Sequence, residues 1–136
     1  MIEATPQVTS WLSVLIGAYM LAGGVGALVR GNLWPEIVAE FESSPALVAV
    51  TGAVAFAVGA IIVTVHNVWT SPAAIIVSLA GWAAVFEGLS LLAIPQLWLR
   101  LARPLMRASK AWGIFMLLLG AFLVSSALVG PLNPSL

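Results

Sequence analysis

The chain has 136 residues, of which 62% are hydrophobic and 7% are charged, and its mean hydropathy is +1.12. Soluble domains are roughly 45–50% apolar, so we predict a single domain, 1–136, that is embedded in lipid. The formal net charge of zero excludes a strongly basic nucleic-acid binder, and the lack of cysteine excludes disulfides and thiolate metal sites.

The first span is expected after a short polar start. Residues 1–10, MIEATPQVTS, contain Glu3 but no lysine or arginine. A secretory signal begins with a positively charged region, so we expect no cleavage here. Residues 11–29 are apolar or small, and about 19 such residues cross roughly 30 Å of hydrocarbon as a helix. Arg30 and the Gly31-Asn32 pair end this span.

Residues 33–45, LWPEIVAEFESSP, are predicted to form a short helix in the membrane interface. Helical spacing separates an apolar face from an acidic face, namely Leu33, Trp34, Ile37 and Phe41 from Glu36 and Glu40. Pro35 suits the first turn of this helix, and Trp34 suits headgroup depth.

The next two spans are predicted at 45–66 and 72–94. Each begins with a serine followed by a proline, Ser44-Pro45 and Ser71-Pro72, which is typical of an N-cap and a first helical turn. Only about five residues connect the two spans, so they are expected to be antiparallel neighbours. Pro95 ends the second of them.

Residues 96–110 are too polar to span and form a basic amphipathic segment. Arginines recur on one helical face and leucines on another: Arg100, Arg103 and Arg107 against Leu97, Leu101 and Leu105. We expect this segment to be bent or broken at Pro104. Its arginines and Lys110 are predicted to contact anionic lipid headgroups or the acidic residues of segment 33–45. A fourth span is predicted at 111–129, ended by Gly130-Pro131.

The basic residues predict the orientation. With four spans, all five fall on the same side of the membrane: Arg30, Arg100, Arg103, Arg107 and Lys110. Lysine and arginine collect in cytoplasmic loops, so we predict that both termini and the turn at 66–71 lie outside the cytoplasm.

Glu87 is the only charged residue inside a predicted span. An acidic residue in mid-span costs roughly 2.5–3.5 kcal/mol on insertion scales, so something must offset this cost. Arg30 at the same end of its helix would provide an ion pair, or the carboxyl group would stay protonated. Both interpretations are structural. The functional alternative is a small proton- or cation-coupled transporter that uses Glu87.

His66, the only histidine, ends the second span beside Asn67 and Trp69. One histidine without a cluster of other ligands cannot make a metal site by itself. The plain interpretation is that His66 caps a helix end or bonds the tight turn, with Trp69 as an interface anchor. The alternative is ligation of a pigment or a haem by His66.

Small residues recur every four positions in three of the spans. The stripes are Ala18, Ala22 and Gly26, then Ala49, Ala53 and Ala57, then Ala80, Ala84 and Gly88. Such stripes let helices approach closely in lipid, either within the bundle or against another chain. The first two spans also look loosely alike (IGAYMLAGGVGALV and TGAVAFAVGAIIV), but the alignment needs one gap and both segments are rich in Gly, Ala and Val, so we do not expect that these two spans are a duplication.

A wider pattern combines HNVW with a later Gly-Trp pair, a glycine and a proline: His66, Asn67, Trp69, Gly81, Trp82, Gly88 and Pro95. In this pattern the chain resembles a family of small, uncharacterised four-helix proteins of the bacterial inner membrane. The resemblance implies the fold and a bacterial membrane but no activity. That family often has lysine where this chain has Glu87, so the resemblance implies no shared mechanism through this side chain.

Together these features predict an all-α, integral membrane four-helix bundle with two short interfacial amphipathic segments. The sequence contains no phosphate-binding glycine loop, nucleophile elbow or paired catalytic carboxylates, so we expect no enzyme and predict no cofactor. The favoured interpretation is an accessory or scaffold subunit. It would bind a larger membrane complex, or self-associate through small-residue faces that include Ala22, Gly26, Ala53, Ala57, Ala84 and Gly88.

Overall fold

The computed structural model describes residues 6–129, except for the side chain of Met106. The predictions concerning Glu3, the termini and the tail after Val129 lie outside these residues. Within them the chain forms six helices: α1 Pro6–Val29, α2 Leu33–Ser43, α3 Pro45–Val65, α4 Pro72–Ala93, α5 Pro95–Arg107 and α6 Ser109–Val129. Helices α1, α3, α4 and α6 are long and apolar enough to cross a membrane. The all-α membrane fold with four spans is therefore confirmed.

The local start signals act as expected at α3 and α4. The Ser44 hydroxyl accepts a hydrogen bond from the Leu47 N–H at 3.3 Å, and the Ser71 hydroxyl accepts one from the Ala74 N–H at 3.2 Å. Each serine satisfies one of the N–H groups that have no partner inside the helix. Helix α1 includes residues from Pro6 onward, earlier than expected, and proline is tolerated in a first helical turn.

Of the expected bend or break at Pro104, the break is wrong, because α5 continues through Pro104 to Arg107. Proline removes one backbone hydrogen bond, which here would go to the carbonyl of Arg100. Arg100 is exposed, so its carbonyl can be solvated instead. The helix ends at Arg107, and the backbone leaves helical geometry at the next residue, Ala108, with φ −89° and ψ 48°.

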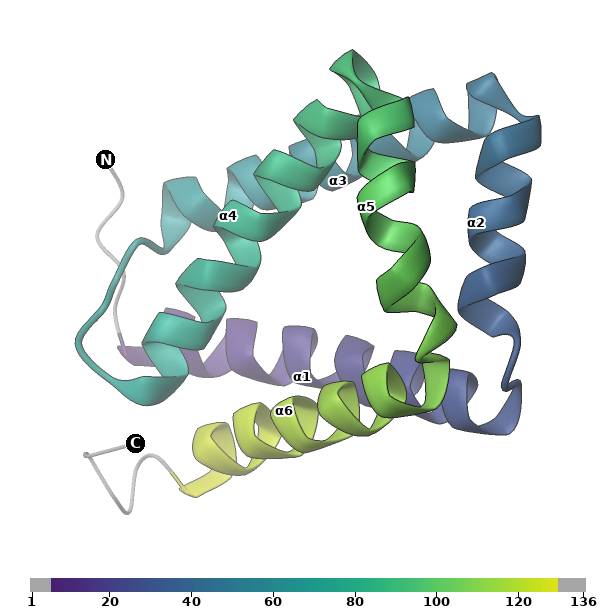
Figure 1. The fold of residues 1–136 in the computed structure, drawn as a ribbon. Coiled ribbons are helices and arrows are strands. Elements are labelled where there is room, and N and C mark those ends of the chain that lie inside the picture. The colour runs from purple at the N-terminus through teal and green to yellow at the C-terminus, as the bar shows by residue number, and fades with distance from the viewer. Residues whose placement is uncertain (1–5, 130–136) are drawn as a thin grey trace.

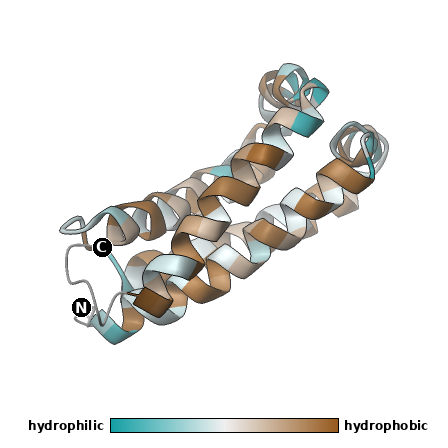
Figure 2. Ribbon diagram, turned by 90° about the horizontal axis from the view of Figure 1, so that it is seen from below, coloured by the Kyte–Doolittle hydropathy of each residue, from teal (hydrophilic) through white to brown (hydrophobic). Residues whose placement is uncertain are grey.

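The four long helices form two pairs. Helix α1 packs along α6, and α3 packs along α4, each pair running antiparallel (Figure 1). The two pairs meet near the turn that follows α3 and diverge toward the opposite end. There α2 and α5 lie side by side and connect one pair to the other (Figures 1 and 2). We call the meeting point the narrow end and the α2–α5 side the wide end.

Within each pair the helices touch through glycine. Every long helix carries two buried glycines seven positions apart, Gly17 and Gly24, Gly52 and Gly59, Gly81 and Gly88, Gly113 and Gly120. A Cβ on Gly59 would lie 2.5 Å from the backbone N of Val85, and one on Gly24 would lie 2.8 Å from the carbonyl oxygen of Gly113. These approaches leave no space for a methyl group, so the pairs are held by backbone-to-backbone packing.

The buried positions also show an internal repeat. Four buried residues of α1 recur 64 positions later as buried residues of α4: Ser13, Gly17, Gly24 and Ala27 become Val77, Gly81, Gly88 and Leu91. Four of α3 recur 61 positions later in α6: Val48, Gly52, Gly59 and Ile62 become Ser109, Gly113, Gly120 and Leu123. Trp34 of α2 and Trp98 of α5 are also 64 positions apart. The repeat unit is thus three helices, not the two consecutive spans that look alike in sequence.

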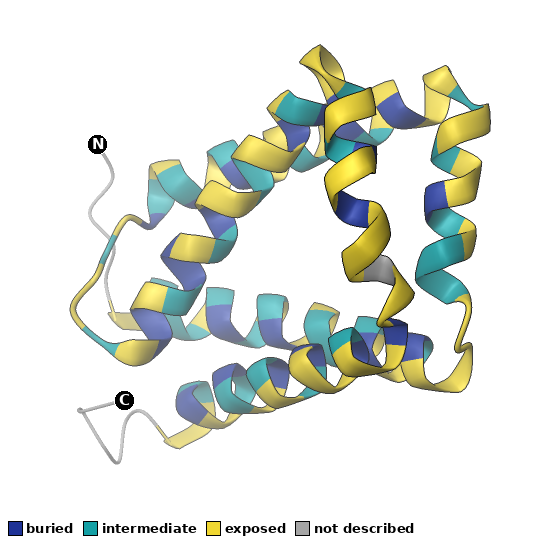
Figure 3. Ribbon diagram, in the orientation of Figure 1, coloured by how far each residue is buried: buried dark blue, intermediate teal, exposed yellow. Residues whose placement is uncertain are grey.

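The packing has the symmetry of this repeat. Exchanging α1 with α4, α2 with α5 and α3 with α6 maps the α1/α6 pair onto α4/α3 and leaves the α2–α5 contact unchanged. Equivalent helices run in the same direction, as in parallel repeats related by an axis along the membrane normal. Apolar side chains from both pairs meet at the narrow end, where Ile62, Ala73, Val77 and Leu123 form a buried cluster. Figure 3 shows that other buried residues follow the lines of contact inside each pair.

Candidate functional site

A buried polar cluster lies at the narrow end. His66 has 0% exposure, and both of its ring nitrogens form hydrogen bonds. Its Nε2 lies 2.9 Å from Oγ1 of Thr9 on α1, and its Nδ1 lies 3.1 Å from Oγ of Ser78 on α4. The His66 side chain therefore joins α1 of one helix pair to α4 of the other.

The Ser78 hydroxyl fixes the tautomer of His66. It donates to the Val68 carbonyl at 2.7 Å and accepts from the Val68 N–H at 3.1 Å. Because its single proton is used, we infer that Nδ1 of His66 carries a proton and donates to Ser78. Nε2 is then the acceptor for the Thr9 hydroxyl. All polar atoms of the cluster are satisfied while the imidazole is neutral.

Burial of the imidazole favours the neutral form of His66. Removal of the imidazole from water lowers the pKa of His66 below its ordinary value, and a backbone hydrogen bond opposes this only in part. Pigment or haem ligation by His66 would require the loss of one of the two ring hydrogen bonds. No group of three or more His, Cys, Asp or Glu side chains within residues 6–129 is arranged to hold a metal ion.

Asn67 and Trp69 stabilise the turn beside this cluster. The Trp69 Nε1–H donates to Oδ1 of Asn67 at 2.9 Å, and the Trp82 Nε1–H approaches the same oxygen at 3.5 Å. The His66 backbone N–H donates to the Ile62 carbonyl at 2.7 Å and caps α3. These hydrogen bonds thus support the structural interpretation of this turn.

Glu87 is exposed on α4 and makes no hydrogen bond or ion pair with other described residues. It lies seven positions after Ala80 and fourteen after Ala73, so the helical repeat places all three near the same side of α4. Ala73 belongs to the buried cluster at the narrow end, against which Leu12 and Ile16 of α1 pack. Glu87 lies nearer the other end of α4, where the two helix pairs have diverged. Its equivalent in the repeat is Gly23.

The expected ion pair between Arg30 and Glu87 is not formed. Arg30 Nη2 lies 3.5 Å from Oε2 of Glu36, and both side chains are largely exposed. Arg30 follows α1, which has diverged from α4 by this depth, whereas Glu36 lies in the first turn of the adjacent α2. Arg30 therefore pairs with the nearby Glu36, and it forms no ion pair with Glu87.

The wide end holds most of the charged residues. Arg103 of α5 forms an ion pair with Glu42 of α2, with Nε donating to Oε1 at 2.6 Å. Phe41 and Trp98 pack nearby with ring centroids 6.3 Å apart. Arg100, Arg107 and Lys110 are exposed and form no ion pair with the described residues. The predicted contact between the basic and acidic segments is thus made by Arg103.

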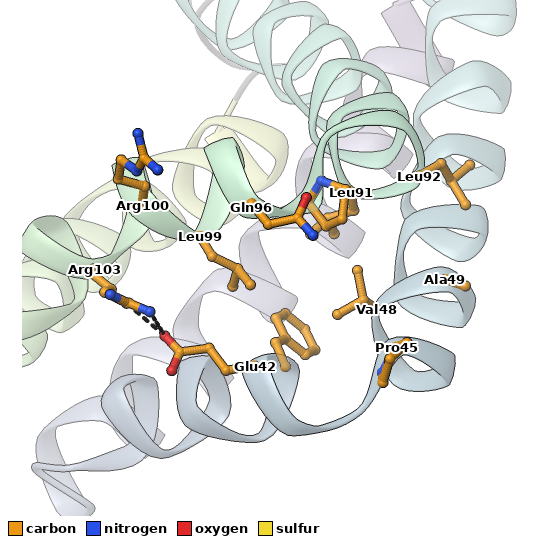
Figure 4. Close-up of a pocket in the computed structure, with 12 residues that line it drawn as sticks. Glu42, Pro45, Val48, Ala49, Leu91, Leu92, Gln96, Leu99, Arg100 and Arg103 are labelled. Atoms are coloured by element: carbon orange, nitrogen blue, oxygen red, sulfur yellow. Dashed lines mark hydrogen bonds and ion pairs between the residues drawn. The ribbon is translucent and has the colours of Figure 1, made fainter.

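A cavity of about 510 Å³ opens at this corner (Figure 4). Its apolar lining comes from α2, α3, α4 and α5 and includes Phe41, Val48, Leu91, Leu92 and Leu99. Polar groups stand along one side. Gln96 reaches into the space between α5 and α3, and Arg100 projects from α5 away from the Glu42–Arg103 pair (Figure 4).

The small-residue stripes divide into two groups. Gly88 lies in the α3–α4 contact, and Gly26 and Ala84 are half-buried. Ala22, Ala53 and Ala57 are exposed, so of the two roles expected for the stripes, packing within the bundle does not apply to them, and contact with another chain stays a prediction. The contacts run through the glycines spaced by seven, because these allow closer backbone approach than alanine. The spacing of the glycines by seven residues can be seen in the sequence, but the small-residue stripes with a spacing of four made it hard to recognise.

Thr9 and Ser78 are the site residues that sequence reasoning missed. Both are common residues in membrane helices, and their role depends on which helices pack together. No protein-family model, curated protein or solved structure matches this chain significantly.

Proposed function

We propose that this protein is a non-enzymatic subunit of the bacterial inner membrane that associates with a second copy of itself, through a contact that includes Glu87. The observation that carries the proposal is the exposure of Glu87 on a spanning helix, without a hydrogen bond or ion pair to the residues that the structure describes. An acidic group in hydrocarbon costs roughly 2.5–3.5 kcal/mol, and such groups normally face another polar group or a bundle interior.

A second copy supplies a suitable group at the right depth. Two copies with the same orientation, both termini outside the cytoplasm, are related by a two-fold axis along the membrane normal. Such an axis brings the two Glu87 carboxyl groups to one level, where they share a proton and form a hydrogen bond. Neither carboxyl group then faces lipid alone.

The exposed alanines provide a second surface for association. Ala18 and Ala22 on α1 and Ala53 and Ala57 on α3 leave these helices with small outer faces. The equivalent positions of the repeat are bulky, Trp82 and Phe86 on α4 and Ile114 and Leu118 on α6. At these positions α1 and α3, unlike α4 and α6, therefore offer small faces that favour close helix approach in lipid.

The test measures the mass of the purified protein in mild detergent, together with cross-linking in native membranes. We expect a dimer for the wild type and for Glu87→Gln, which keeps hydrogen bonding, and a monomer for Glu87→Leu. Leu89→Ala, an exposed position on the same helix, is the control and should remain dimeric. An Ala53→Phe, Ala57→Phe double variant tests the α3 face against the control Val54→Phe.

A wild-type monomer in both assays would overturn the proposal. A dimer that survives Glu87→Leu but is lost in the double alanine variant would assign the contact to α3 instead. Co-purification of a different membrane protein with a monomeric wild type would replace self-association by an accessory role in a larger complex.

The competing proposal is a proton or cation path through Glu87. It is favoured by the location of the carboxyl group on a spanning helix, at a depth where the helix pairs have diverged. Purified protein in liposomes would then carry a flux that Glu87→Gln abolishes. Absence of flux, or a flux that the variant leaves unchanged, would eliminate this candidate.

A further inference from the structure

The corner cavity at the wide end has the features of a site for an amphiphile. Its volume of about 510 Å³ is within the range of roughly 300–1,000 Å³ typical of small-ligand pockets. Its lining combines apolar side chains, Phe41, Val48, Leu91 and Leu92, with the polar side chains of Gln96 and Arg100. A ligand that fits this lining has a hydrocarbon part and a polar head.

The location of the cavity restricts the kind of amphiphile. It lies where α3 begins and α4 ends, at the termini of two spanning helices, beside the amphipathic α2 and α5. This is the depth at which the acyl chains of a phospholipid meet its headgroup. Trp34 and Trp98, on α2 and α5, are residues of the type that favours this depth.

The charges restrict the headgroup. Glu42 neutralises Arg103, which leaves Arg100 as the cavity residue with a positive charge and no ion pair among the described residues. Arg100 projects away from Glu42, so the carboxylate does not occupy its guanidinium (Figure 4). A guanidinium binds a phosphate through paired, charge-assisted hydrogen bonds. The neighbouring Arg107 and Lys110 add positive charge along the same side of the protein.

We propose that this cavity binds one anionic phospholipid, with an acyl chain against Phe41, Val48, Leu91 and Leu92 and the headgroup phosphate at Arg100. Gln96 is placed to hydrogen-bond to the ester or glycerol oxygens. The lipid would fill the space between α2, α5 and the start of α3, and so stabilise the wide end of the molecule.

The test is native mass spectrometry of the full chain in detergent, with phosphatidylglycerol or phosphatidylcholine of the same acyl chains added. We expect one retained phosphatidylglycerol per chain and at least about tenfold weaker retention of phosphatidylcholine. Arg100→Gln should weaken phosphatidylglycerol retention by about tenfold, and Ala49→Phe, which adds bulk to the cavity wall, should abolish it.

Two matched controls keep the test specific. Lys110→Gln removes an exposed positive charge outside the cavity, and Ala46→Phe adds the same bulk on α3 outside it. Both should retain the lipid within about twofold of the wild type, and all variants are first shown to keep the wild-type helix content and thermal stability.

Three results would overturn the proposal. Equal retention of phosphatidylglycerol and phosphatidylcholine would show that the charge of the headgroup has no role in binding. Equal losses in Arg100→Gln and Lys110→Gln would reduce the effect to general attraction of a basic surface. Displacement of the lipid by millimolar glycerol phosphate would assign Arg100 to a soluble phosphate compound instead of a membrane lipid.

Discussion

Oγ1 of Thr9 and Nε2 of His66 lie 2.9 Å apart, and their hydrogen bond joins the α1/α6 pair to the α3/α4 pair. The two residues are separated by 57 positions in the chain. The helix pairs diverge away from this point, so the bond lies where the two halves of the molecule have their closest contact (Figure 1).

Thr9→Val should destabilise the protein by about 1 to 2 kcal/mol, because it leaves the buried Nε2 of His66 without a donor while keeping the shape of the side chain. The measurement is thermal or denaturant unfolding in a fixed detergent. Thr64→Val is the matched control. The Thr64 hydroxyl bonds only the Ala60 carbonyl of its own helix and is exposed, so its loss should be nearly neutral. Equal effects of the two variants would contradict the role given to Thr9.

Stability should depend on pH through His66. The unfolded chain takes up a proton at His66 near pH 6.5, whereas burial lowers the pKa of the folded form. The unfolded state therefore binds more protons, and stability is full above about pH 6.5 and falls as the pH drops toward the lower pKa of the folded state. Unfolding midpoints between pH 8 and pH 5 check this. His66→Gln should show a flatter profile than the wild type, and parallel profiles would rule out His66 as the source.

Gly59→Ala should destabilise the α3/α4 pair by about 1 to 3 kcal/mol. The added Cβ would lie 2.5 Å from the Val85 backbone N and 2.8 Å from the Gly81 carbonyl oxygen, so the helices would have to separate. Gly26→Ala is the control, since its Cβ would meet only the end of the Leu33 side chain, at 3.3 Å. That variant should be neutral or slightly stabilising, because alanine favours the helix. Comparison of the two unfolding curves shows whether a loss of stability comes from the close backbone contact at Gly59 or from the replacement of any helical glycine.

Arg103→Gln should lower stability by less than about 1 kcal/mol. The Glu42–Arg103 pair is well formed but roughly half exposed, and exposed ion pairs are screened by water and salt. Trp98→Ala, which removes the ring packed near Phe41, should have the larger effect. A larger loss in Arg103→Gln than in Trp98→Ala would show that the α2–α5 contact is mainly electrostatic.

The sequence was sufficient for the elements that depend on local signals. Length and apolar composition located the four spans, and Ser44-Pro45 and Ser71-Pro72 gave the starts of α3 and α4 to the residue. Segment 33–45 was correctly expected to be a short amphipathic helix because its glutamates have helical spacing. These features require no knowledge of which helices touch.

The features that depend on helix rotation were not predicted. Alanine and glycine are so frequent in the spans that stripes such as Ala53 and Ala57 occur on faces that make no internal contact. The glycine pairs spaced by seven, such as Gly52 and Gly59, identify the true contact faces, but only comparison of all four spans makes them stand out. The pairing of Arg30 with Glu36 similarly depends on the divergence of α1 from α4.

The most direct test of the whole account is the sidedness of the two ends of the molecule, because the four-span arrangement, the predicted side of His66 and the predicted cytoplasmic side of the proposed lipid site all depend on it. The chain lacks cysteine, so single variants report without background. Thr70→Cys, in the exposed turn at the narrow end, should react with an impermeant maleimide on intact cells, and Ser43→Cys, at the wide end, only after lysis. The reverse pattern would invert the orientation, and labelling of both positions on intact cells would contradict the four-span arrangement itself.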